Sequence, residues 1–237
     1  MSTHIDVIDH KVVTQQEWIE ASAELLIEEK ELTRHRDEVS RLRRELPWVR
    51  GEKNYVFDGP NGKETLADLF AGRSQLITYH FMFAPGDEGC PGCSFVSDHI
   101  DGANLHLAHH DVTLLAVSRA PLAEFLPFKK RMDWDFKWVS SAGTDFNYDF
   151  WVSYTRAELD RDKVLHNFTI QKLNGEEQPG LSAFYKDPAG SIFHTYSSYE
   201  RGLDLLVGAY NYLDLTPKGR NEASGMDWLN FHDKYDE

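Results

Sequence analysis

The 237-residue sequence predicts an α/β protein, a three-layer α/β/α sandwich with a central mixed sheet and an added long helix at the N-terminal end. Two apolar segments, residues 75–83 and 112–117, each precede a segment with helical spacing, which is typical of parallel strands joined by helical crossovers. Two alternating segments, residues 181–185 and 191–196, flank the turn sequence KDPAG and predict an antiparallel hairpin. Parallel and antiparallel pairing together predict a mixed sheet.

The composition is that of a globular chain with a strong acidic balance. Lys and Arg number 25 against 39 Asp and Glu, and the net charge of −14 repels nucleic acid backbones and anionic lipid surfaces. No segment reaches the roughly 18 consecutive apolar residues that span a bilayer, and residues 1–13 lack the apolar core of a secretion signal. We therefore expect a cytoplasmic protein with neither nucleic acid nor membrane as a partner.

Residues 14–46 predict one long helix. Thr14 and Glu17 form a capping box, Pro47 ends the helix, and an apolar seam recurs every seven residues. The seam consists of Trp18, Leu25, Leu32, Val39 and Leu46. A helix with so narrow a seam either wraps the main domain or pairs with its copy in a homodimer. We expect a helical arm over residues 1–46 and a second unit, the main domain, over residues 47–237.

The elements of the main domain follow in order. Residues 55–57 predict a short strand, 58–62 a turn, 65–70 a short helix, and 75–83 a strand buried on both faces that leads into two cysteines. Residues 94–110 predict a helix, 112–117 a second buried strand, and 121–132 a helix with proline at its start. Residues 136–140 and 168–170 predict further strands, and residues 203–213 predict the last helix, which follows the hairpin.

Cys90 and Cys93 are the only cysteines of the chain, and Pro91 and Gly92 separate them. A C-x-x-C pair between a buried strand and a helix is typical of thiol–disulfide chemistry rather than of a structural bridge. With Cys90 at the N-cap, Pro91 suits the first helical position, and the free N–H groups of Gly92 and Cys93 favour a Cys90 thiolate. Asp87 and Glu88, directly before the pair, oppose this effect by raising the pKa of the thiol. The pattern predicts Cys90 as the attacking nucleophile and Cys93 as the resolving thiol.

Two resemblances extend this interpretation. Residues 54–93 resemble the opening of thioredoxin and peroxiredoxin-like domains. The segments YHFMF (79–83), SRAP (118–121), WVSS (138–141), FNYD (146–149) and LTPKGR (215–220) resemble the bacterial family known as domain of unknown function 899, DUF899. The second resemblance covers nearly the whole chain and implies a thioredoxin-like fold. In that fold a cis-proline before an antiparallel strand faces the cysteines, and Pro179 matches that position.

Two departures from these relatives concern the activity. Thioredoxins typically place Trp before the first cysteine and Gly-Pro between the two, whereas this chain has Gly89 before the pair and Pro-Gly within it. Peroxiredoxins place a proline and a hydroxyl side chain ahead of the reactive cysteine. Pro85 is present here, but residues 86–89 supply no hydroxyl.

Other side chains have both a functional and a structural interpretation. His80, inside the strand 75–83, either carries a proton for the sulfurs or is a core histidine. Arg119 follows a central strand and is a candidate for binding an anion. Trp138 either lines an apolar cleft beside the cysteines or packs in the core.

Four histidines crowd the segment after the cysteines: His99, His106, His109 and His110. The second and fourth have the i, i+4 spacing of zinc ligands, and a solvated helix face is the alternative. Because the chain has only one C-x-x-C, we expect no metal, and we expect no bound cofactor.

The sequence as a whole predicts a thiol–disulfide oxidoreductase that acts on a protein or small-molecule thiol or disulfide. One alternative is a thioredoxin-fold binding or scaffold protein without turnover. The other is a peroxide reductase, in which Cys90 would form a sulfenic acid.

Overall fold

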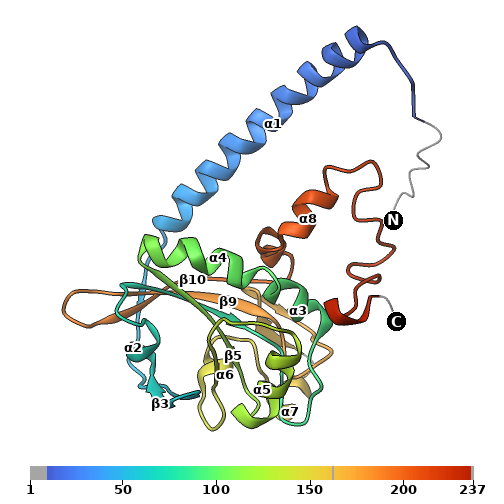
Figure 1. Ribbon diagram of the computed structural model, residues 1–237. Helices are drawn as coiled ribbons and strands as arrows, with labels where there is room; N and C mark the ends of the chain where they lie inside the picture. The colour runs from blue at the N-terminus through green and yellow to red at the C-terminus, as the bar shows by residue number, and fades with distance from the viewer. Residues whose placement is uncertain (1–9, 162, 236–237) are drawn as a thin grey trace.

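The computed structural model describes residues 10–161 and 163–235, so the first nine residues of the predicted arm and the last two of the predicted main domain lie outside the description (Figure 1). The helices are α1 (Gln15–Arg44), α2 (Leu66–Leu69), α3 (Pro91–Ser97), α4 (Ile100–Leu107), α5 (Leu122–Arg131), α6 (Phe146–Asp149), α7 (Arg156–Leu159) and α8 (Gly208–Leu213), with 3₁₀ turns η2 (Ala108–His110), η3 (Glu200–Leu206) and η4 (His232–Lys234). The strands are β1 (Val49–Arg50), β2 (Val56–Gly59), β3 (Gly62–Thr65), β4 (Gln75–His80), β5 (Val112–Ser118), β6 (Trp138–Ser140), β7 (Val164–His166), β8 (Thr169–Gln171), β9 (Gly180–Lys186) and β10 (Ile192–Tyr199).

Eight strands form the main sheet in the order β1-β10-β9-β4-β5-β6-β2-β3. The central strands β4, β5 and β6 are parallel, whereas β4 pairs antiparallel with β9, and β9 with β10. The predicted mixed sheet, the parallel pair β4 and β5, and the hairpin β9–β10 are therefore confirmed. Strands β7 and β8 form a separate two-stranded sheet.

Helices cover both faces of the sheet, which confirms the three-layer α/β/α sandwich. On one face, side chains of α3, α4, α5, η3 and α8 pack into an aromatic-rich core that includes Cys93. On the other face, α2 and α6 pack against β2, β4, β5 and β9. Alternate residues of β4 and β5 point to the two faces, so the strands are buried on both sides, as their continuous apolar sequences predict.

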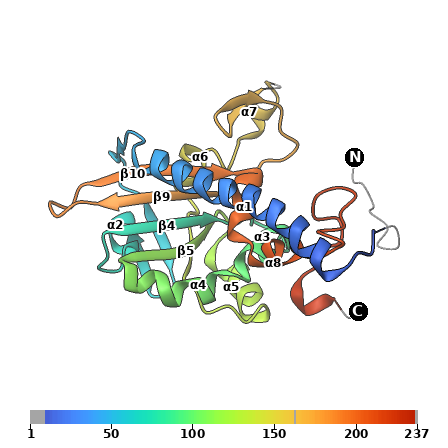
Figure 2. The ribbon, with the colours of Figure 1, turned by 90° about the horizontal axis from the view of Figure 1, so that it is seen from above.

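The long N-terminal helix is confirmed, and it leads away from the sheet and extends beyond it (Figure 1, Figure 2). Thr14 caps α1 through the predicted capping box with Glu17. None of the residues of α1 is buried. Trp18, Leu25 and Leu32 of the apolar seam are 57%, 59% and 51% exposed, so the described chain does not cover this part of the seam.

The helix predicted over residues 94–110 is in fact two helices, because the chain bends at Asp98 and His99. The Asp98 carboxylate accepts hydrogen bonds from Trp134 Nε1 at 2.8 Å and from His232 Nδ1 at 2.7 Å. His99 Nδ1 bonds the carbonyl of Phe95, and its Nε2 accepts the N–H of Ala209 at 3.1 Å. The bend therefore connects α3 to α8 through His99 and to η4 through Asp98. The single helix predicted over residues 203–213 is likewise divided, by extended backbone at Val207, into η3 and α8.

Candidate functional site

Cys90 and Cys93 lie at the start of α3, directly after the loop that leaves β4. Cys90 is the N-cap residue, as predicted, and Pro91 occupies the first helical position. The N–H of Cys93 donates a hydrogen bond to Cys90 Sγ at 3.3 Å, and the N–H of Met82 donates one to Cys93 Sγ at 3.5 Å. Both cysteines are free thiols, Cys90 half-buried and Cys93 buried.

The two thiols differ in acidity. The thiol of Cys93 hydrogen-bonds Cys90 and, with the N–H groups of Cys93 and Gly92, lowers the pKa of Cys90 to about 7 against the opposing effects of burial and of Asp87. Complete burial raises the pKa of Cys93 well above its ordinary value. At neutral pH the partly buried sulfur is thus a thiolate in a large fraction of molecules, and the buried one is a thiol. The roles of Cys90 as nucleophile and of Cys93 as resolving thiol stay predictions, and they require a difference in acidity in this direction.

The loop before Cys90 explains why this chain lacks the tryptophan of thioredoxins. Gly89 has a φ of +98°, and a Cβ there would lie 2.6 Å from the ring of Phe128. A side chain at position 89 would therefore clash with α5 and strain the backbone. The ring of Phe128, in α5, occupies the space that a side chain at position 89 would need.

A cavity of about 620 Å³ opens beside Cys90. Its lining combines both cysteines with residues of β4, η3 and α8 and with the C-terminal segment, residues 220–226. Met226 of that segment lies directly over α3, because a Cβ on Gly92 would meet its sulfur at 3.2 Å and Cys90 Sγ at 3.9 Å. Cys90 therefore faces a pocket that is open on one side, and part of its wall is made by residues 130 or more positions further along the chain.

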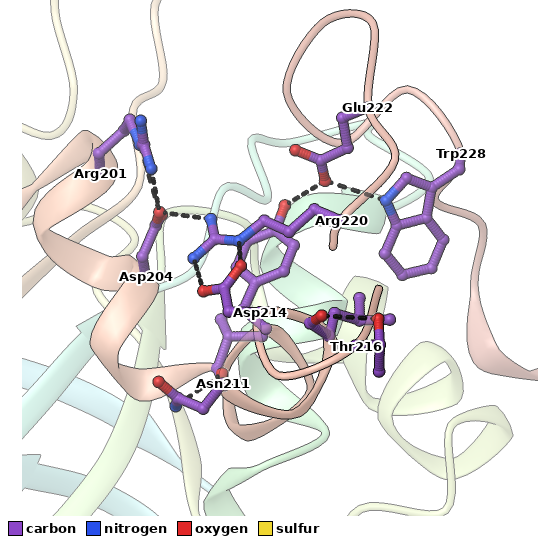
Figure 3. Close-up of polar contacts among 11 residues, drawn as sticks. Arg201, Asp204, Asn211, Asp214, Thr216, Arg220, Glu222 and Trp228 are labelled. Atoms are coloured by element: carbon purple, nitrogen blue, oxygen red, sulfur yellow. Dashed lines mark hydrogen bonds and ion pairs between the residues drawn. The ribbon is translucent and has the colours of Figure 1, made fainter. Parts of the chain in front are cut away.

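A polar cluster holds the C-terminal segment in place (Figure 3). The Arg220 guanidinium lies 3.7 Å over the ring of Tyr210 and binds the carboxylates of Asp204 at 2.8 Å and Asp214 at 2.9 Å. Glu222 accepts hydrogen bonds from the Tyr210 hydroxyl at 2.8 Å and from Trp228 Nε1 at 2.9 Å. The segment is thus anchored to η3 and α8 at the edge of the pocket. Sequence analysis assigned it no role.

Tyr79 is a second residue at the site that sequence analysis missed. Its side chain is 1% exposed, and burial beside Cys93 raises its pKa well above the ordinary value. The hydroxyl makes no hydrogen bond of ordinary geometry within the described residues, yet it lies close enough to the Cys93 thiol to lower the pKa of that thiol against the larger effect of burial. Strand alternation could have identified it, because Tyr79 faces α3 and the next residue faces away.

Two of the predicted supporting residues lie differently from expectation. Pro179 lines the pocket with Cys90, but no cis peptide bond occurs among the described residues, so the cis-proline prediction is wrong. The chain enters β9 extended, since Gly180 pairs with His80 on one side and with Tyr199 on the other. His80 lies on the opposite face of the sheet, where it packs against Phe146, and its Nε2 bonds Ser182 Oγ at 2.9 Å.

The buried position of His80 removes it from the sulfur chemistry. Burial lowers the pKa of His80 to about 3, so its ring is neutral at physiological pH. The interpretation as a proton carrier for the cysteines is wrong, because the side chain projects into the core between the sheet and α6. The interpretation as a core histidine fits the structure, although Nδ1 has no hydrogen-bond partner in the described chain.

The two proposed substrate-binding residues do not lie in the cavity. Trp138 is fully buried, stacks on Phe125 with ring centroids 4.5 Å apart, and donates its indole N–H to Ser118 Oγ at 3.0 Å. Arg119 pairs with Glu177 at 2.6 Å, so its charge is compensated. Trp138 is therefore a core residue, and the predictions of an aromatic cleft and an anion site at these positions are not supported by their surroundings.

The four histidines after the cysteines do not gather at one point. His99 connects α3 with α8, whereas His106, His109 and His110 are exposed. Among the described residues no three His, Cys, Asp or Glu side chains are grouped so that they could hold a metal ion. The described helices include none that is long and apolar enough to cross a membrane.

The site and the fold together define the class: a thioredoxin-like α/β protein with a C-x-x-C pair at the start of the helix that follows a central strand. Residues 7–235 match the family described as "Bacterial protein of unknown function (DUF899)", and the chain belongs to that family. No curated protein matches the chain.

Solved structures with similar folds include peroxiredoxins. Peroxidoxin BcpB from Mycobacterium tuberculosis is 13% identical, with a TM-score of 0.44 over 68% of this chain and 92% of that one. Peroxiredoxin Q from Xanthomonas campestris is 15% identical, with a TM-score of 0.45 over 69% of this chain and 95% of that one.

Proposed function

We propose that the protein is a dithiol–disulfide oxidoreductase in which Cys90 attacks and Cys93 resolves. The observation that carries the proposal is the position of Cys90, whose sulfur lines a cavity of about 620 Å³ while it accepts the N–H of Cys93 at 3.3 Å. A partly exposed, stabilised thiolate beside a buried thiol is the arrangement that two-step exchange requires. An inert buried pair would have neither an open cavity nor a stabilised thiolate.

The exchange proceeds in two balanced steps. The Cys90 thiolate attacks one sulfur of a substrate disulfide, a mixed disulfide forms, and the first substrate thiolate leaves. Cys93 then loses its proton and attacks Cys90 Sγ, which forms the Cys90–Cys93 disulfide and releases the second substrate thiolate. The two cysteines are oxidised and the substrate is reduced by two electrons, and an external dithiol returns the pair to its reduced form.

The reduction potential of the pair tests this proposal. The purified protein is equilibrated in glutathione buffers of different poise, and free thiols are trapped with a mass label. We expect a reversible couple within about −270 to −120 mV, the range of known dithiol enzymes. Cys90→Ser and Cys93→Ser variants serve as controls and give no intrachain disulfide. Absence of a disulfide in the native protein at every poise would contradict the proposal and favour the scaffold alternative.

The same preparation separates the exchange reaction from peroxide reduction. Addition of an organic hydroperoxide to Cys93→Ser protein, followed by a sulfenic acid trap, labels Cys90 if the site reduces peroxides. We expect labelling to be slow relative to disulfide exchange, because residues 86–89 supply no hydroxyl near Cys90. We propose the cytoplasm as the compartment, since its thiol pool keeps such a pair reduced between turnovers.

A further inference from the structure

The cavity beside Cys90 has the size of a small-molecule site, for which volumes of about 300 to 1,000 Å³ are typical. Its buried walls are apolar: Tyr79, Leu203 and Val207 are at most 5% exposed, and Met82 and Met226 are partly buried beside the sulfurs. The charged lining residues Glu200 and Arg201, by contrast, are exposed. A molecule that reaches Cys90 therefore exchanges water for apolar side chains.

The charges around the cavity disfavour an anion. Its lining includes three carboxylates, Glu200, Asp204 and Glu222, and two guanidiniums. Both arginines are already paired, Arg201 with Asp204 at 3.1 Å and Arg220 with Asp204 and Asp214 (Figure 3).

The negative charge of Glu222 is not compensated in the same way. Within the described residues its carboxylate accepts hydrogen bonds from a phenol, Tyr210, and an indole, Trp228, both neutral donors. Asp87, on the other side of Cys90, is near enough to raise the pKa of the thiol. The lining thus carries more carboxylates than guanidiniums, and both guanidiniums are already paired.

We infer that the site takes a small, uncharged and largely apolar disulfide and disfavours anionic disulfides. This inference rests on the proposed exchange function and adds the substrate class. The enclosing segment, residues 220–226, narrows access to Cys90, and the apolar walls supply binding energy of about 25 cal/mol per Å² of apolar surface removed from water. A carboxylate on the substrate would lose hydration without meeting a free cation.

A matched pair of aromatic disulfides tests the inference. 2,2′-Dithiodipyridine is neutral, and 5,5′-dithiobis(2-nitrobenzoate) carries a carboxylate on each ring. The first releases 2-thiopyridone, which absorbs in the near ultraviolet, and the second releases a coloured thiolate, so stopped-flow absorbance gives the rate constant of reduced full-length protein with each. The ratio of the two rates is divided by the same ratio for 2-mercaptoethanol, an uncharged thiol, which removes the intrinsic reactivity of the reagents. We expect the normalised ratio to favour the neutral reagent by about tenfold at low salt.

Two further measurements tie the preference to the cavity. Glu222→Gln keeps an acceptor for Tyr210 and Trp228 and removes one negative charge, so we expect it to bring the normalised rate ratio closer to one. The control Glu52→Gln removes a charge from an exposed loop at the other end of β10 and should leave the ratio unchanged. Added sodium chloride accelerates the anionic reagent alone, which keeps the test valid if the Glu222 variant does not fold.

A normalised ratio near one, or faster reaction with the anionic reagent, would overturn the substrate class. Failure of the proposed function gives a different result, because then neither reagent produces the Cys90–Cys93 disulfide.

A different observation carries a second inference, which concerns α1. The helix has 30 residues and none is buried, although stability of protein helices comes mainly from packing of an apolar face. Eight large apolar side chains of the arm are 44% to 60% exposed: Trp18, Ile19, Leu25, Leu26, Ile27, Leu32, Leu42 and Leu46. Residues 15–31 carry six glutamates and one lysine, whereas residues 32–44 carry five arginines and two acidic residues.

We infer that this face is covered by α1 of a second copy in antiparallel orientation. That orientation places the acidic half of each helix against the basic half of the other, whereas a parallel pair would place like charges together. The sequence analysis expected a homodimer as one alternative, and the charge distribution now selects the direction of the helices.

Single cysteines on α1 test the orientation in a Cys90→Ser/Cys93→Ser background. An antiparallel pair brings residue 22 of one copy near residue 40 of the other. We therefore expect oxidation to cross-link a mixture of Ser22→Cys and Ser40→Cys proteins and to leave either protein alone uncross-linked. Cross-linking of Ser22→Cys alone would show a parallel pair, and a monomer in sedimentation equilibrium at micromolar concentration would overturn the inference altogether.

Discussion

The low pKa of Cys90 depends first on its neighbour, which a pair of substitutions at position 93 can separate from the fold. The Cys93 thiol is the largest of the effects that lower the pKa of Cys90 to about 7. Cys93→Ala removes that hydrogen-bond donor and leaves the N–H of residue 93 in place. Cys93→Ser keeps a donor of similar size. We expect the pKa of Cys90 to rise towards the ordinary value in the alanine variant and to stay low in the serine variant.

The size of the effect follows from the two pKa values. If the pKa of Cys90 rises from about 7 to the ordinary value of about 8.5, the thiolate fraction at pH 7 falls from about one half to about 3%. A thiolate of higher pKa is also a better nucleophile, with a Brønsted slope of about 0.4–0.5, which restores about fivefold. The alanine variant should then react about threefold more slowly than the native protein at pH 7 and about fivefold faster at high pH.

The assay is the rate of alkylation of Cys90 by iodoacetamide from about pH 5 to about pH 10, with the modified residue identified by mass spectrometry. The crossing of the two rate profiles is the diagnostic result, because a loss of fold would change rates in one direction at every pH. A midpoint for Cys93→Ala within about half a unit of the native midpoint would refute the role given to the Cys93 thiol.

The remaining predictions concern the surroundings of the pair. Asp87→Asn removes a charge that raises the pKa of Cys90, so the pH midpoint of Cys90 alkylation should fall below the native midpoint. A midpoint above the native one would contradict the effect assigned to Asp87. Trp138→Ala should lower the free energy of unfolding in urea by about 3–5 kcal/mol and leave the pH midpoint of Cys90 alkylation unchanged. A shifted midpoint would show that Trp138 does influence the cysteine site. The pKa of His80 is about 3 in the folded protein, below its unfolded value of about 6.5. Burial of the neutral ring therefore lowers the free energy of unfolding as the pH falls below about 6.5, by about 2 kcal/mol at pH 5. His80→Gln should flatten that pH dependence, whereas the exposed His106→Gln should not, and equal slopes would contradict the burial effect.

The layers of the fold were predictable from the sequence because local patterns and tertiary packing agree in them. The buried strands β4 and β5 have continuous apolar sequences, and the capping box at Thr14 is both a sequence motif and an observed pair of hydrogen bonds. The division of the predicted helix at Asp98 was not predictable. It depends on Trp134 and His232, which reach Asp98 from 36 and 134 positions away.

The site was predictable only where the chemistry is local. The positions of Cys90 at the N-cap and of Pro91 after it follow from four consecutive residues. The exclusion of Trp138 from the site follows from α5, because Phe125 stacks on its indole ring. Likewise, His80 and Tyr79 are adjacent in the sequence, but the sheet places one in each core, and only Tyr79 meets Cys93.

The reactive cysteines and the walls of the cavity come from different parts of the chain, for a physical reason. The sulfur chemistry needs only a strand, a loop and a helix start, which residues 75–97 supply. Selection of a substrate needs walls around the sulfur, and these come from η3, α8 and residues 220–226. Arg220 joins the parts of the wall to one another, since its guanidinium lies over Tyr210 of α8 and pairs with Asp204 of η3, so the wall is fixed by side chain contacts away from the sulfurs. Substitutions in this cluster should therefore change which disulfides react before they change the acidity of Cys90.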